Sequence, residues 1–211
     1  KRKNMDNQLQ ILELIFNTIL DKSVERSTAL LSTRNLINSS SQENINFSEP
    51  DTAALKHLLN LLKQNSFNAA LEFGNKLLPT FNESPLLLNL LGNAYQALNN
   101  LDLALEKFDK ATELRPNFFD AHFNLANARA SKGMFIRALE SYYLALTIRP
   151  NEPYVLNNAG NVFLSLKKYR EAITLYENCI EIKPNFVDPY TNLSVLSAEK
   201  GNLSQAVAYS K

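Results

Sequence analysis

Small and large apolar residues recur along this chain with a period of 34 residues. An alanine occupies the same place five times, and a large apolar residue always stands three places before it. The alanines are Ala70, Ala104, Ala138, Ala172 and Ala206. A fixed period of this length is typical of a solenoid of stacked units rather than of a globular enzyme domain.

Within each period, apolar residues recur every three or four positions in two blocks, which predicts two amphipathic helices. Residues that tolerate the left-handed conformation separate the two blocks, and Lys167 departs from this rule. They are Asn65, Asn99, Gly133 and Gly201. Pro116, Pro150 and Pro184 close three units. The predicted units are 51–84, 85–118, 119–152, 153–186 and a truncated 187–211, and no segment alternates as a strand would.

The residues that repeat have characteristic sizes. A small residue in the first helix, an aromatic residue in the second, the alanine and the closing proline together resemble the tetratricopeptide repeat family over residues 51–211. The first two sets are Gly92, Ala126 and Gly160, and Phe108, Tyr142 and Tyr176. The resemblance implies an all-α, right-handed α-solenoid of about five 34-residue helix-turn-helix repeats. The first unit departs from the pattern with Leu58, Gly74 and Asn82, and Pro79 should end its second helix near Leu78.

Residues 1–50 lie outside the repeat and predict an N-terminal helical extension followed by a polar linker. Leu9, Leu12, Phe16 and Ile19 share one helical face. Three roles are open for this extension: it covers the exposed edge of the first repeat, it pairs two copies of the chain through residues 6–20, or it lies in the groove as an internal ligand.

The charges of the chain are balanced, with 22 basic and 21 acidic residues among 211. This balance gives no reason to expect a nucleic-acid partner or an anionic membrane surface. The sequence has no apolar run of about 18 residues, so we expect no membrane span. A single cysteine fits a reducing compartment, and we expect a cytoplasmic protein. Because the chain ends at Lys211 inside an expected helix, we expect it to be a piece of a longer protein.

Residues able to carry out catalysis are few and fall at helix-packing places. His57 and His122 lie in first helices, where a histidine within the core is the simplest interpretation. Cys179 takes the place that Ala111 and Ala145 fill in neighbouring units, which indicates a small buried residue rather than a nucleophile. The histidines lack metal-ligand spacing, and no glycine-rich phosphate loop is present. The sequence therefore predicts no catalytic residue, no metal site and no cofactor in this chain.

Asparagine is enriched on one side of the first helices. From residue 85 onward it fills 8 of the 12 positions at the fifth, sixth and ninth places of the units. These residues are Asn89, Asn93, Asn124, Asn127, Asn157, Asn158, Asn161 and Asn192. The family resemblance implies that this side lines the concave wall, together with Phe123 and Tyr154. An amide both donates and accepts hydrogen bonds, so a row of amides can bind the main chain of an extended peptide. The alternative is that the amides join neighbouring helices.

The charge on this wall bears on the kind of peptide. Repeat domains that clamp a C-terminal carboxylate present several cations there, whereas Lys63 is the only cation we assign to the wall, so an acidic tail is disfavoured. We predict a protein-interaction module that binds an extended, neutral or mixed polypeptide in an asparagine-lined groove. The first alternative is the substrate-presenting arm of a larger enzyme whose catalytic domain lies beyond residue 211. The repeats also resemble those of the glycosyltransferases that add O-linked N-acetylglucosamine to proteins. The second alternative is an assembly piece that pairs two copies of the chain through residues 6–20.

Overall fold

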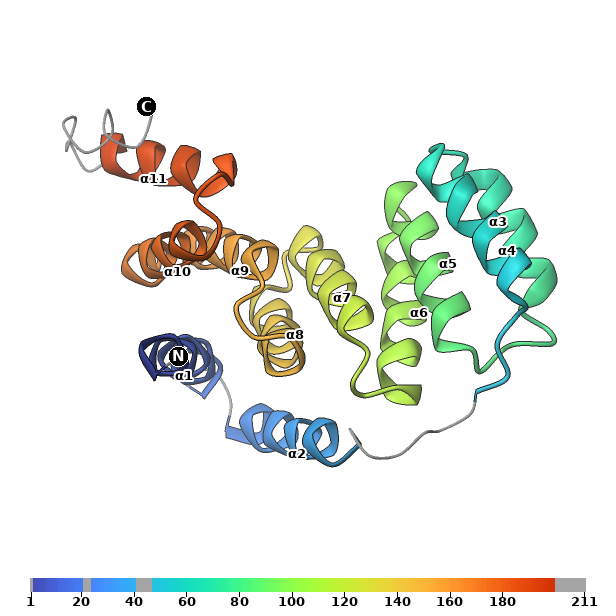
Figure 1. The fold of residues 1–211 in the computed structure, drawn as a ribbon, viewed down its shortest axis with the longest axis horizontal. Coiled ribbons are helices and arrows are strands. Elements are labelled where there is room, and N and C mark those ends of the chain that lie inside the picture. Colours follow the sequence, from blue (N-terminus) through green and yellow to red (C-terminus); the bar gives the residue numbers. More distant parts are fainter. Residues whose placement is uncertain (1, 21–23, 41–46, 200–211) are drawn as a thin grey trace.

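The computed structural model describes residues 2–20, 24–40 and 47–199, and these residues form helices with no strand. Figure 1 shows the helices stacked side by side as an arched solenoid. Four helix pairs follow one another, and the first helix of a further pair comes after them. They are α3 (Thr52–Lys63) with α4 (Phe67–Leu77), α5 (Pro85–Ala97) with α6 (Leu101–Leu114), α7 (Phe119–Ser131) with α8 (Phe135–Ile148), α9 (Pro153–Ser165) with α10 (Tyr169–Ile182), and α11 (Val187–Glu199). The predicted all-α solenoid is confirmed.

The turns within the pairs adopt the left-handed conformation that the sequence predicts. The φ angles are 56° at Asn65, 59° at Asn99 and 74° at Gly133. Lys167 adopts the same conformation, with φ of 59°, although a lysine gains nothing from it. The helix pairing therefore imposes the turn even where the residue does not favour it. Gly201 lies outside the described residues.

In the first unit, the small and the large residue have exchanged places between the two helices, which explains its departures from the repeat pattern. In later units a small residue of the first helix faces an aromatic ring of the second, and a Cβ atom added to Gly92 would lie 2.5 Å from the Phe108 ring. In the first unit the large residue is Leu58 and the small one is Gly74, where a Cβ atom would lie 2.5 Å from Leu91 of the next unit. The two substitutions compensate each other in volume, which keeps the packing dense. Helix α4 ends at Leu77, two residues before Pro79, as predicted.

The N-terminal extension forms α1 (Arg2–Leu20) and α2 (Val24–Ser40), which pack against the second helices of the solenoid. Helix α1 contacts α8 and α10, and α2 contacts α8 (Figure 1). The Phe16 ring lies 5.9 Å from the Tyr143 ring, and the Arg34 guanidinium donates a 2.8 Å hydrogen bond to the Tyr143 hydroxyl. The expectation that this extension covers the edge of the first repeat is therefore wrong. It also does not lie along the first helices that carry the asparagines, as an internal ligand would.

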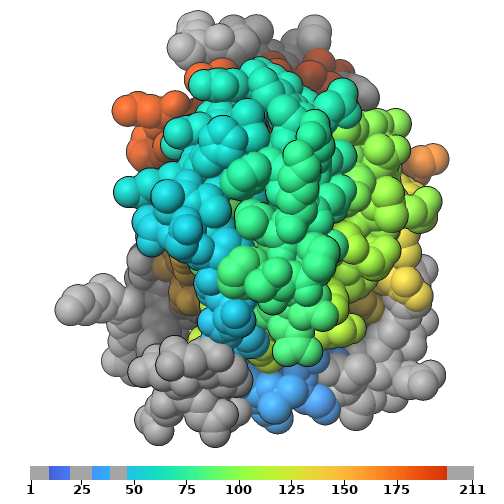
Figure 2. All heavy atoms as spheres, turned by 90° about the vertical axis from the view of Figure 1, so that its right-hand side faces the viewer, coloured from blue at the N-terminus to red at the C-terminus, as the bar shows by residue number. Residues whose placement is uncertain are grey.

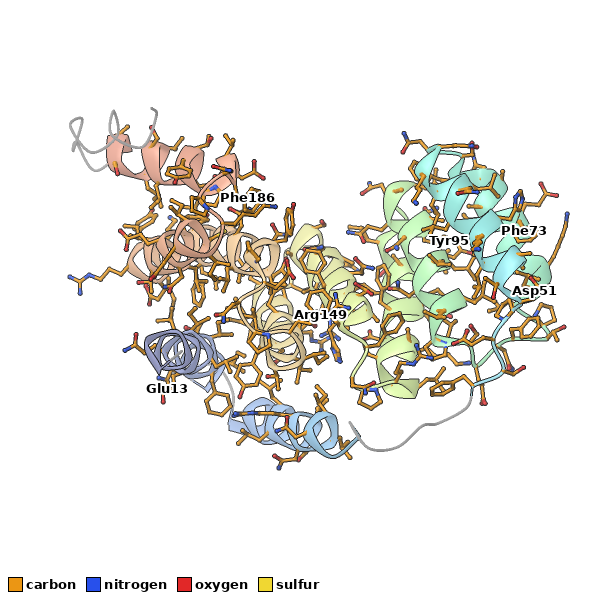
Figure 3. All side chains as sticks on the ribbon, in the orientation of Figure 1. Glu13, Asp51, Phe73, Tyr95, Arg149 and Phe186 are labelled. Carbon is orange, nitrogen blue, oxygen red and sulfur yellow. The ribbon has the colours of Figure 1, made fainter. Side chains whose placement is uncertain are left out.

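The apolar face of α1 is buried within the chain. Ile15 and Ile19 are fully buried, and Ile11 and Leu12 nearly so, whereas Glu13 lies on the side of α1 away from the solenoid (Figure 3). Pairing of two copies through residues 6–20 would thus require α1 to leave α8. This form of self-association remains a prediction, and it would expose the apolar face of α1 that the chain itself buries.

Candidate functional site

The eight asparagines predicted to line the concave wall lie on four successive first helices. We call this set the asparagine wall. Helix α5 carries Asn89 and Asn93, α7 carries Asn124 and Asn127, α9 carries Asn157, Asn158 and Asn161, and α11 carries Asn192. Because each helix is the first of its pair and the pairs stack, the asparagines follow one another from repeat to repeat.

Hydrogen bonds between amides join neighbouring repeats. In each case a side-chain Nδ2 group donates to the Oδ1 atom of an asparagine in the preceding repeat. The bonds run from Asn124 to Asn89 (3.0 Å), from Asn158 to Asn127 (2.9 Å), and from Asn192 to Asn161 (2.9 Å) and to Asn157 (3.3 Å). The structural role that the sequence left open is thus present in this structure.

Two tyrosines fix the orientation of the amides in the middle of the wall. The Tyr142 hydroxyl donates a 2.7 Å hydrogen bond to Asn127 Oδ1, and the Tyr176 hydroxyl donates an equivalent bond to Asn161 Oδ1. Burial raises the pKa of both hydroxyls above its ordinary value, so both keep the proton that they donate. Each of these Oδ1 atoms then accepts two hydrogen bonds, one from tyrosine and one from an asparagine, which uses both lone pairs.

The amide nitrogens of Asn127 and Asn161 are left as donors. No residue in the described part of the chain accepts a hydrogen bond from either Nδ2 group. Asn93 differs, because Phe108 occupies the place of the tyrosine and has no hydroxyl to offer. Its amide makes no side-chain hydrogen bond to a described residue, so its orientation is not fixed in this way.

The eight amides differ in exposure. Asn161 is exposed, while Asn93, Asn124, Asn127, Asn158 and Asn192 are half-buried. Asn89 and Asn157 retain only 6% and 3% of their accessible surface. These two buried amides accept hydrogen bonds from the next repeat and leave little surface for a ligand to touch. The accessible part of the wall is therefore smaller than the sequence pattern indicates.

Two cavities lie along the wall, and their chemistry differs. The polar cavity, among α7, α8 and α9, has a volume of about 340 Å³. Its polar lining is Asn127, Asn158, Asn161, Ser131, Ser165 and Tyr142, and Ala130, Phe135 and Val162 complete it. The apolar cavity, among α3, α5 and α7, has a volume of about 560 Å³. Its lining includes Leu55, Lys56, Leu59, Leu86, Leu90, Phe118 and Phe123, together with Asn89, Asn93 and Asn124.

The structure corrects the assignment of cations to the wall. Lys56 lines the apolar cavity, so Lys63 is not the only cation of the first helices on this side. The sequence signal for Lys56 was present, because it stands at the sixth place of its unit, where Asn124, Asn158 and Asn192 stand in theirs.

Tyr154 lies apart from the two cavities. Its hydroxyl accepts a 2.8 Å hydrogen bond from Lys183, and its ring centroid lies 4.9 Å from that of Phe186, between α10 and α11 (Figure 3). It lines neither the polar nor the apolar cavity. A role for Tyr154 in binding remains a prediction, and its contacts in this structure belong to the junction of the last two repeats.

The histidines and the cysteine have different surroundings. His122 is buried, and its Nε2 group donates a 2.8 Å hydrogen bond to the carbonyl oxygen of Pro116. Cys179 is also buried, which raises the pKa of its thiol to about 12 and makes it a poor nucleophile. His57 is exposed, with its ring edge-on to Phe73, so its expected place in the core is wrong. Among the described residues, no group of three or more His, Cys, Asp or Glu side chains is placed to hold a metal.

Comparison with known families agrees with this geometry. Models of the tetratricopeptide repeat match residues 92–133, 119–152 and 153–186. These matches identify residues 92–186 as tetratricopeptide repeats. Within the described ranges, no helix is both long and apolar enough to cross a bilayer.

Relatives of this chain include repeat regions of large proteins. Human protein O-mannosyl-transferase TMTC1 is 32% identical over 100 residues, which make up 46% of this chain and 11% of that protein. The probable UDP-N-acetylglucosamine–peptide N-acetylglucosaminyltransferase SEC of Arabidopsis thaliana is 30% identical over 135 residues, or 63% of this chain and 13% of that protein. The chain thus spans a small part of these two relatives.

Solved structures share the fold. MamA from Desulfovibrio magneticus RS-1 superposes with a TM-score of 0.68 at 18% identity, covering 74% of this chain and 89% of that one. YrrB, described as a TPR protein with an unusual peptide-binding site, superposes with a TM-score of 0.62 at 20% identity, covering 82% and 88%. At these identities the likeness concerns the fold.

Proposed function

We propose that this chain is a protein-interaction module that holds an extended polypeptide along the asparagine wall. In this proposal the Nδ2 groups of Asn127 and Asn161 donate hydrogen bonds to main-chain carbonyl oxygens of the peptide at the polar cavity. Asn158 donates with the second hydrogen of its Nδ2 group, since the first is bonded to Asn127. Main-chain recognition does not depend on the peptide's side chains, so this part of the wall accepts many sequences.

One observation carries the proposal: the Oδ1 atoms of Asn127 and Asn161 each accept two hydrogen bonds, whereas their Nδ2 groups donate to no residue that the structure describes. Both amides are held in one orientation by the tyrosine hydroxyls, so little side-chain entropy is lost when a peptide binds. Each additional hydrogen bond contributes about 0.5–1.5 kcal/mol net, so several are needed for useful affinity. The peptide-binding site described for YrrB supports the same class of function.

The test replaces the donors without removing the internal acceptors. Asn127→Asp and Asn161→Asp keep an oxygen for the tyrosine and the neighbouring asparagine, and replace each Nδ2 group by an oxygen that repels carbonyls. A fluorescein-labelled pool of random octapeptides, acetylated and amidated, serves as the probe in fluorescence anisotropy. We expect the double variant to bind the pool about ten-fold more weakly than the native chain, with a melting temperature that changes little.

Asn68→Asp is the matched control, because Asn68 is exposed on α4, a second helix away from the wall. It should bind the pool as the native chain does. Binding that is unchanged in the double variant, or equally weakened in the control, contradicts a role for the donor amides. Failure of the native chain to bind any peptide contradicts the proposed function itself.

The second candidate function is a substrate-presenting arm of a larger enzyme. The observation that favours it is the 30% identity to the SEC protein of Arabidopsis thaliana, of which this chain spans 13%. The coding sequence after Lys211 tests this candidate. A glycosyltransferase domain there supports it, and a stop codon or further repeats alone contradict it.

A further inference from the structure

The side of the first helices that carries the asparagines, which we call the inner wall, changes its chemistry along the solenoid. At the fifth, sixth and ninth places, the first unit has Leu55, Lys56 and Leu59, with no asparagine. The second unit has two asparagines and Leu90, the third has two and Phe123, and the fourth has asparagine at all three places. The wall is therefore apolar at α3 and polar at α9, which gives an extended ligand two different environments.

The apolar end forms a cavity rather than a flat patch. Leu55 and Leu59 of α3 face Leu86 and Leu90 of α5 and Phe123 of α7 around its volume of about 560 Å³. Leu59 keeps 40% of its surface exposed, which leaves its side chain accessible to a ligand. Helix α3, with α4, forms the exposed end of the solenoid in Figure 2. A cavity of this kind, apolar with a few amides at its side, suits a large apolar side chain.

The charges around the cavity are unequal. Lys56 lines it from α3 and forms no ion pair with any described residue. Asp120 lines it from α7, and the Asp120 carboxylate forms an ion pair with the Arg149 guanidinium at 3.8 Å. The uncompensated charge is thus the positive one at the α3 side. A ligand group with a negative charge at that side is complementary to it.

We propose that the apolar cavity binds a large apolar side chain of an extended peptide, with an acidic residue next to it lying against Lys56. From there the main chain of the peptide continues past Asn93 toward the donors on α7 and α9. The cavity selects the sequence, and the amides hold the chain. This inference rests on the proposed function, because the cavity and the donors bind one and the same peptide.

Three pools of labelled octapeptides test the cavity. The first pool has adjacent Asp and Leu in either order at its centre, within random Gly, Ser, Thr and Asn. The second replaces Leu by Ser, and the third replaces Asp by Lys. We expect the native chain to bind the first pool about ten-fold more tightly than the second, because the leucine loses its contact with water. The preference over the third pool should be smaller and should decrease with salt.

Two variants with matched controls locate the effect. Leu59→Ser should remove the preference for leucine, while Leu103→Ser, at a side chain 42% exposed on α6, should keep it. Lys56→Glu should make the third pool the preferred one over the first, and Lys110→Glu, at an exposed lysine of α6, should not. The charge reversal at exposed Lys56 removes no buried contact, so it remains informative even if Leu59→Ser proves unstable.

The outcomes distinguish a failure of the apolar-cavity proposal from a failure of the proposed function. Equal binding of the first and second pools, in a chain whose binding still weakens with Asn127→Asp and Asn161→Asp, overturns the apolar cavity and leaves the proposed function intact. A loss of preference in Leu103→Ser equal to that in Leu59→Ser also overturns it. If no pool binds the native chain, both proposals fall.

Discussion

At the scale of single residues, His122 makes the stability of the fold depend on pH. Its Nε2–H group donates a hydrogen bond to the Pro116 carbonyl oxygen, and its buried Nδ1 atom has no hydrogen-bond partner among the described residues. Burial lowers the pKa of His122 from 6.5 to about 4. Between pH 6.5 and 4 the unfolded chain therefore takes up a proton that the folded chain does not. This contribution to stability is complete above pH 6.5 and decreases as the pH falls, by up to about 1.4 kcal/mol per pH unit.

Urea unfolding of His122→Gln and His57→Gln, each at pH 7.5 and pH 5, measures this contribution. The native chain should be less stable at pH 5 than at pH 7.5. His122→Gln should lower the stability at pH 7.5 and shrink the difference between the two values. His57→Gln is the control, because His57 is exposed and its variant should keep the native difference. If His122→Gln lost as much stability between pH 7.5 and pH 5 as the native chain does, this assignment would be contradicted.

The sequence placed these two histidines alike, and the structure separates them for a physical reason. His57 stands at the place where Leu91, Leu125 and Ala159 are buried in later units. Leu91 packs against Gly74 of the preceding repeat, whereas the residues described before α3 form no repeat that could cover His57. The periodic pattern assumes equal neighbours on both sides, so it fails where the array begins. The sequence pattern also did not predict the tyrosine–asparagine hydrogen bonds, because it groups Tyr142 and Tyr176 with Phe108 by size, although their hydroxyls distinguish them.

At the scale of elements, α8 differs from the other second helices. Leu139, Tyr143 and Leu146 are buried on a face where α6 has Leu105, Asp109 and Thr112. This additional apolar face is the one that α1 and α2 cover. The sequence carried the signal in the run Tyr142, Tyr143, Leu144, but the repeat pattern alone could not say which segment would cover it. The partner lies more than a hundred residues away in the chain.

Because α1 packs against α8, shortening one buried side chain of α1 should lower the stability of the chain strongly. Ile15 is fully buried in the same cluster as Tyr143, so Ile15→Ala leaves a cavity and should lower the free energy of unfolding by about 2–5 kcal/mol. Asn17→Ala, at an exposed place of α1, should have little effect. Denaturant unfolding followed by circular dichroism measures both. An effect of Ile15→Ala no larger than that of Asn17→Ala would show that α1 does not hold the solenoid in solution.

At the scale of the whole molecule, burial is distributed unevenly along the solenoid. Helix α8 buries eight residues, whereas α3 buries Leu58 alone and α4 buries Ala70 and Gly74. In a repeat array each unit is stabilised mainly by its neighbours. The units around α8 have a neighbour on each side and the N-terminal helices in addition, while α3 and α4 stand at one end. The period predicted the stacking, but not this gradient, which depends on a segment outside the repeat.

The gradient predicts that the molecule opens from the α3 end. In native-state hydrogen exchange, the amides of α3 and α4 should exchange through an opening of lower free energy than those of α8 and α9. Ile15→Ala should reduce the protection of α8 and α10 and leave that of α3 and α4 nearly unchanged, because α1 packs against α8 and α10. One common opening free energy for all the helices would contradict the gradient. Since α3 supplies one side of the apolar cavity, the peptide pool that carries Asp and Leu should raise the protection of α3 by stabilising its closed state.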